Sequence, residues 1–82
     1  MSIELGKRIV KSREAKHIKQ WELAVRSCIS VGFLSDVENG KRNISADNLL
    51  AIAIVLDKSL DWLMTGKIFR DEEKVLDSGE VK

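Results

Sequence analysis

The chain has 82 residues and a net charge of +1, and a chain this short is expected to form one domain with a thin core. Because Cys28 is the single cysteine and His17 the single histidine, an intrachain disulfide and a zinc site are excluded, which leaves oligomerisation as the expected reinforcement. No apolar run approaches the ~20 residues of a membrane span and the N-terminus has no signal-peptide core, so we expect a cytoplasmic protein without a membrane partner.

Five short helices are predicted in chain order. They cover residues 3–16, 20–27, 31–39, 46–56 and 60–65. A serine that can cap the first turn precedes four of them: Ser2, Ser30, Ser45 and Ser59. Gly40 and Gly66 follow apolar-periodic runs, where helices commonly end. Short connections and the lack of strand-like alternation predict a compact all-α domain.

The apolar faces of these helices indicate how they pack. In the first helix Leu5, Ile9 and Arg13 recur on one face, and in the third helix Leu34 and Val37 share the inward face. The segment 46–56 is apolar nearly all round, so this helix is either buried centrally or faces a second partner.

Between Leu5 and Gly66 the chain resembles the Cro/cI-type (XRE) helix-turn-helix family. The resemblance is carried by Arg13, by QWELA at residues 20–24, by LSDVENGKR at 34–42 and by LDKSLDWLMTG at 56–66. It implies a five-helix, lambda-repressor-like DNA-binding domain over residues 1–66, in which the second and third helices read DNA. Two short helices across a three-residue turn expose one helix whole, as insertion into the ~12 Å major groove requires.

The chain departs from the family pattern at two positions. The family often has glycine where this chain has His17, and usually where it has Cys28. Both positions tend to need a positive φ, which histidine tolerates better than most residues and cysteine does not. The turn at Cys28 is therefore either strained or opened by a residue.

The resemblance also assigns roles to side chains. Arg13 and Glu38 are expected to form a partly buried structural ion pair; the alternative is two independent surface charges. Phosphate contacts are expected from Lys19, Gln20, Ser30, Asn39, Lys41, Arg42 and Asn43; the alternative is that the loop and the helix start are merely solvated.

The outer face of the third helix is expected to meet base edges through Val31, Gly32, Ser35 and Asp36. None of these is Arg, Lys, Gln or Asn, the usual bidentate readers, so we expect DNA shape to contribute to specificity. Val31 can pack on a thymine methyl. Asp36 either accepts from a base amino group or repels phosphate at non-specific sites. Phe33 is expected to pack in the core beneath the helix; the alternative is a half-exposed position near the DNA backbone.

An exposed apolar surface is predicted, formed by Ile54, Met64, Ile68 and Phe69. It is either a homodimer interface or is covered by residues 67–76, and residues 67–82 as a whole are predicted to be an acidic tail that forms a short helix or a linker. The charges are segregated along the chain. Residues 1–70 hold twelve Lys and Arg and eight Asp and Glu, whereas residues 71–82 hold two Lys and Arg and five Asp and Glu. A mildly basic body suits a polyanionic partner, but it equally fits an ordinary solvated surface.

The sequence thus predicts a transcriptional regulator that binds double-stranded DNA specifically, a phage or prophage repressor acting as a dimer on a palindromic operator. An antitoxin or a restriction-modification controller would share every residue discussed, and a helical interaction module that has lost DNA binding is the alternative of another class. No nucleophile–base pair, metal cluster or phosphate-cradling loop is recognisable, so we expect no enzyme activity, cofactor or small-molecule ligand.

Overall fold

A computed structural model of the protein describes residues 3–67. It contains five helices: α1 (Ile3–Ala15), α2 (Gln20–Arg26), α3 (Val31–Glu38), α4 (Ala46–Leu56) and α5 (Leu60–Thr65). The predicted all-α class and the five helices are confirmed. The first three helices each end one residue earlier than predicted, because a residue that has left helical geometry follows each of them; Ser27 and Asn39, for example, have ψ near 0°. Ser2 lies outside the described residues.

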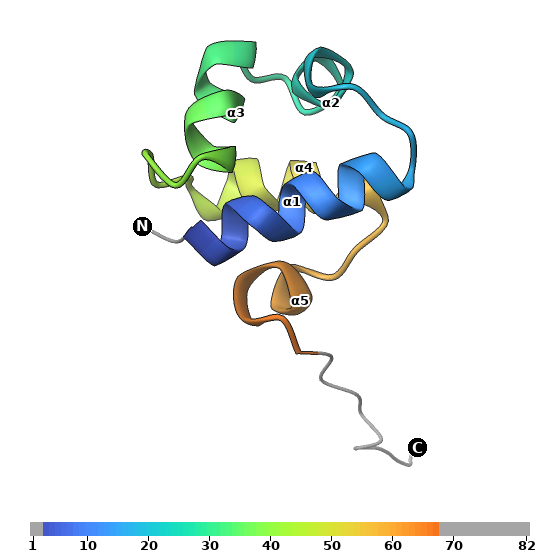
Figure 1. The fold of residues 1–82 in the computed structure, drawn as a ribbon, viewed down its shortest axis with the longest axis vertical. Coiled ribbons are helices and arrows are strands. Elements are labelled where there is room, and N and C mark those ends of the chain that lie inside the picture. The colour runs from blue at the N-terminus through green and yellow to red at the C-terminus, as the bar shows by residue number, and fades with distance from the viewer. Residues whose placement is uncertain (1–2, 68–82) are drawn as a thin grey trace.

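The helices are arranged around α1, which crosses the middle of the molecule (Figure 1). On one side of it lie α2 and α3, and on the other lies α5, with α4 behind α1 in this view. The contacts agree, since α1 packs on α3 and α5 while α4 packs on α2 and α5. The α2–α3 unit and α5 therefore occupy opposite ends of a shared support.

The core is aliphatic and draws on every helix. Its fully buried larger side chains are Ile9, Leu23, Leu34, Val37, Ile52, Leu56 and Leu63. Although α4 is apolar nearly all round, it buries only Leu49, Ile52, Ala53 and Leu56. Leu50 and Ile54 stay exposed on its outer side, so α4 is not enclosed by the described part of the chain.

Each of the five helices is followed within two residues by a residue in the left-handed conformation, and only two of these residues, Gly40 and Gly66, are glycines. His17, Cys28 and Asp57 have φ of 59°, 60° and 58°, and Gly40 has 74°. After Cys28 the Ile29 N–H donates to the Ala24 carbonyl at 3.0 Å, and the same bond links Ile18 to Arg13. The α2–α3 turn therefore closes with no inserted residue, and Cys28 holds a conformation that costs an ordinary side chain about 1–2 kcal/mol.

Two contacts fix α1 against its neighbours. Gly6 is buried in α1, and a Cβ built there would overlap the Glu38 carbonyl oxygen and lie 2.7 Å from the Val37 carbonyl oxygen, so α1 and α3 pack backbone to backbone. At the other end Arg8 donates from Nε to the Leu63 carbonyl at 2.8 Å and from Nη2 to the Met64 carbonyl at 3.0 Å. Arg8 thereby caps the end of α5 and ties it to α1. Among the described helices none is long and apolar enough to cross a membrane.

Candidate nucleic-acid interface

Helix α3 lies at the surface with one face anchored and the other open. Leu34 and Val37 are buried beneath it. On the outer face Val31 is 40% exposed, and a Cβ at Gly32 would meet no atom within 4 Å. Ser35 and Asp36 are half-buried on the same side of the helix. All four residues predicted to meet base edges are therefore accessible from solvent.

A buried polar cluster holds α3 in this position. Arg13 Nε on α1 donates to Glu38 Oε2 at the end of α3 at 3.0 Å, and Nη2 donates to Oε1 at 3.3 Å. Arg13 Nη1 also donates to the Ile18 carbonyl at 3.1 Å, which joins the α1–α2 connection to the same cluster. Only 13% of the Arg13 side chain and 5% of the Glu38 side chain are exposed, so the two charges compensate each other away from solvent.

Gln20 belongs to this cluster, which the sequence did not indicate. Its Nε2 donates to Glu38 Oε1 at 2.9 Å, so Glu38 holds the side chain at the start of α2. One amide N–H of Gln20 is used in this bond, and the second remains for a ligand. Lys19 precedes it as an exposed residue whose side chain makes no cap hydrogen bond.

The other residues predicted to bind phosphate follow or begin α3. Lys41 and Asn43 are exposed in the loop after the helix. Asn39 is exposed too, but its Nδ2 donates to the Ser35 carbonyl at 2.9 Å. Ser30 caps the helix start, where the Phe33 N–H donates to its hydroxyl at 3.0 Å.

Arg42, from the same loop, turns back onto α3. Its Nε lies 3.7 Å from Asp36 Oδ2, and its guanidinium carbon lies 5.4 Å from the centroid of the Phe33 ring. Phe33 is half-buried and packs against the core, as predicted, but its outer side carries this cation. The contacts of Arg42 were not foreseen, because sequence spacing does not show how a loop folds back.

Two exposed apolar residues on α2 were also missed. Trp21 is 56% and Val25 is 65% exposed, one turn apart on the outer side of this helix. Their residue types alone do not show which side of a short helix stays exposed, so the sequence carried no signal for this placement. Beside them Glu22 and Arg26 form an exposed ion pair at 3.0 Å.

Exposed apolar side chains also occur on α4 and α5. Ile54 on α4 is 71% exposed, Met64 on α5 is 58% exposed, and Leu50 adds a third apolar side chain at 48%. Ile68 and Phe69, the other predicted members of this surface, lie outside the described residues, as does the segment proposed to cover it.

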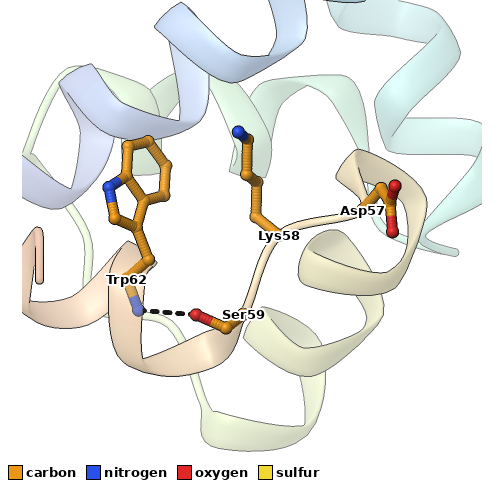
Figure 2. Close-up of a pocket in the computed structure, with 4 residues that line it drawn as sticks. All are labelled: Asp57, Lys58, Ser59 and Trp62. Atoms are coloured by element: carbon orange, nitrogen blue, oxygen red, sulfur yellow. Dashed lines mark hydrogen bonds between the residues drawn. The ribbon is translucent and has the colours of Figure 1, made fainter. Parts of the chain in front are cut away.

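The turn between α4 and α5 forms a small hollow of about 250 Å³, lined by Asp57, Lys58, Ser59 and Trp62. Figure 2 shows the Lys58 and Trp62 side chains extending from this turn in the same direction, with the Lys58 ammonium 5.1 Å from the ring centroid. The hollow is smaller than the roughly 300–1,000 Å³ of ordinary small-molecule sites. No group of three His, Cys, Asp or Glu within residues 3–67 could hold a metal ion. The α2–α3 end therefore carries the candidate site.

Comparison with known proteins bears on the whole domain. A helix-turn-helix family matches residues 3–63. The ImmF control region 10 kDa protein of Bacillus phage phi105 is 39% identical over 70 residues, which are 85% of this chain and 78% of that protein.

Solved structures share the fold. The restriction-modification controller protein C.AhdI of Aeromonas hydrophila is 34% identical with a TM-score of 0.72, and the match covers 74% of this chain and 92% of that one. The N-terminal DNA-binding domain of SinR from Bacillus subtilis is 30% identical with a TM-score of 0.73, covering 77% and 93%. SinR, described as the master regulator for biofilm formation, has also been solved in complex with DNA; that chain is 33% identical, with a TM-score of 0.69 and coverage of 73% and 97%.

Proposed function

Because the chain belongs to the helix-turn-helix family and is a DNA-binding transcriptional regulator, we propose that it is a phage- or prophage-type repressor that occupies a palindromic operator as a homodimer. The observation that carries the proposal is the placement of α3. The helix is fixed from behind by Leu34, Val37 and the buried Arg13–Glu38 pair, and its outer face is free to enter a major groove.

Residues around α3 divide into two roles in this proposal. Val31, Gly32, Ser35 and Asp36 meet base edges, and the open space at Gly32 allows the backbone to approach the bases. The phosphates on either side are bound by Lys19, Gln20, Ser30, Asn39, Lys41, Arg42 and Asn43. Glu38 supports the second role, since it orients the Gln20 amide at the groove edge.

The homodimer is proposed to form through the apolar end, by way of Ile54, Met64, Ile68 and Phe69. Their exposure in the described part, 71% for Ile54 and 58% for Met64, supports this surface as a partner interface. Met64 belongs to α5, which lies across α1 from α2 and α3 (Figure 1), so two copies joined through α5 leave both α3 helices free. A two-fold dimer would match half-sites about 34 Å apart.

A second candidate of the same class is a restriction-modification controller, which the 34% identity to a controller protein supports; an antitoxin of this fold would use the same residues. A methylase gene beside this one would favour the controller, and a toxin gene would favour the antitoxin. A divergent phage regulator gene would favour the phage repressor. In each case we propose a non-enzymatic protein of the cytoplasm, with residues 1–66 as the DNA-binding domain and 67–82 as an acidic tail.

The proposal is tested by selecting bound duplexes from a random pool and then measuring affinity for the selected duplex as salt is raised. A palindrome is expected, together with a linear fall of log affinity against log salt, because Lys and Arg displace counterions from phosphates. Lys41→Gln should reduce the salt slope by about one. The matched control Lys58→Gln, at the opposite end, should leave it unchanged. If the protein binds no duplex even at low salt, or if its affinity does not change with salt, the result would instead support a protein-interaction module.

A further inference from the structure

The outer face of α3 lacks a side chain for the base that regulators read most often. Guanine presents two acceptors in the major groove, N7 and O6, and a bidentate Arg or Lys is its usual reader. Val31 and Gly32 have no side-chain donor, Ser35 has one hydroxyl, and the Asp36 carboxylate can only accept. A guanine facing this helix would therefore be unread by the helix itself.

The loop after α3 supplies the missing donor. Gly40, with a φ of 74°, reverses the chain, and its N–H donates to the Val37 carbonyl at 3.1 Å. The Lys41 N–H then donates to the Asp36 carbonyl at 2.8 Å, which fixes the loop against the last turn of the helix. Arg42 follows directly, and its side chain turns back to Asp36 on α3 while remaining 58% exposed.

Two contacts hold the guanidinium of Arg42 there. Asp36 pairs with its Nε across 3.7 Å, and the Phe33 ring lies beneath it, 5.4 Å from the guanidinium carbon. Phe33 and Asp36 are three residues apart, so they are neighbours on one side of α3. Since Asp36 pairs with Nε, the two terminal nitrogens of Arg42 remain for a planar pair of acceptors.

We infer that Arg42 and Asp36 act as one composite base reader, in which Arg42 donates to N7 and O6 of a guanine and Asp36 is the positioning residue that holds it. This inference rests on the proposed function, from which it departs by moving Arg42 from the phosphate backbone to a base edge. The Asp36 carboxylate favours that assignment, because it repels phosphates near it and attracts the guanidinium to the face of α3. Exposure of 58% for Arg42 and 44% for Asp36 leaves both accessible to DNA.

The experiment measures affinities of the wild type and of Arg42→Ala for the selected operator and for duplexes in which each guanine of a half-site is replaced in turn. For the wild type, replacing one guanine in each half-site should weaken binding about tenfold or more. Arg42→Ala should lose that discrimination and retain discrimination at every other position. Lys41→Ala is the matched control from the same loop, and it should weaken all duplexes equally.

The variant Asp36→Asn tests whether Asp36 positions Arg42 or only repels DNA through its negative charge. We expect it to bind all duplexes more tightly, because a negative charge leaves the interface, while its preference for the same guanine falls. The inference is overturned if Arg42→Ala weakens every duplex equally and lowers the salt slope by about one, which is the behaviour of a phosphate contact. A selected half-site without guanine also overturns it. A wild-type protein that binds no duplex contradicts the proposed function itself, so the two failures are distinguishable.

Discussion

The two ends of this domain rest on the same aliphatic core but are held by different contacts. At the α2–α3 end a buried Arg13–Glu38 pair and the Gln20 amide fix the helices, and the surface carries exposed Trp21 and Val25 beside its polar residues. At the α4–α5 end, α5 is held by aliphatic packing and by the hydrogen bonds of Arg8 to the Leu63 and Met64 carbonyls, and Ile54 and Met64 are left exposed. This contrast indicates that α3 needs orientation as well as burial, because a groove-reading helix must keep one face free, whereas an apolar face is positioned by the surface on which it packs.

The largest effect should come from the polar cluster. Glu38→Ala leaves the Arg13 guanidinium buried without its partner and releases Gln20, and breaking such a pair typically costs about 3–5 kcal/mol of unfolding free energy. Urea unfolding followed by circular dichroism measures it. The control is Glu22→Ala, which removes the exposed Glu22–Arg26 pair and should cost about 0.5 kcal/mol or less. Equal losses in the two variants would mean that burial does not distinguish the two pairs.

The next effect concerns the contact between α1 and α3. Gly6→Ala places a methyl group against the Val37 and Glu38 carbonyls, so the helices must separate, at a cost of about 1–3 kcal/mol. Gly32→Ala is the matched control on the open face of α3 and should stabilise the fold by up to about 1 kcal/mol through helix propensity. Thermal unfolding of both variants checks the pair. Similar midpoints would contradict the close approach of α1 to α3.

At the apolar end, Ile54→Ser should weaken self-association about tenfold or more, because the substitution removes an exposed apolar side chain from the proposed interface. Sedimentation equilibrium measures the dimer dissociation constant. The monomer should keep its stability, since Ile54 is outside the core. Val25→Ser, an equally exposed apolar residue on α2, is the control and should leave association unchanged; an equal loss there would move the interface to the other end.

The smallest effect is expected at the α2–α3 turn. Cys28→Gly relieves a left-handed conformation at a non-glycine residue and should raise stability by about 1 kcal/mol. Asp57→Gly serves as the comparison at the α4–α5 turn, where aspartate tolerates the left-handed region better and the gain should be smaller. The denaturant midpoints of both variants measure these two gains in stability. A loss of stability in Cys28→Gly would show that the cysteine side chain contributes more than its backbone costs.

Much of the fold was predictable because local signals agreed. Serine caps at 30, 45 and 59 and apolar periodicity located the helices, and Leu34 and Val37 indicated the inward face of α3. The left-handed position at Asp57 could not be found, since it lacks the glycine that marks Gly40 and Gly66. Gly6 carried an unused signal, because a glycine inside a helix costs about 1 kcal/mol and often marks a close approach.

The candidate site was less predictable, because its contacts join residues distant in sequence. Gln20 and Glu38 are 18 residues apart, and nothing in their spacing shows that one carboxylate serves both Gln20 and Arg13. Arg42 reaches Asp36 only because Gly40 reverses the chain between them. Exposure of Leu50 but not Leu49 likewise depends on how α4 sits against α2 and α5, which periodicity cannot resolve in a helix that is apolar nearly all round.

The central question about this protein is which end of the molecule meets DNA. Backbone amide chemical shifts, recorded as a selected duplex is titrated into the protein, report this residue by residue. We predict large shifts at Val31 to Asp36 and in the loop after α3, with amides at the exposed positions of α4 and α5 unchanged once dimer formation is complete. Shifts concentrated on α4 and α5, with those of α3 unmoved, would contradict the account.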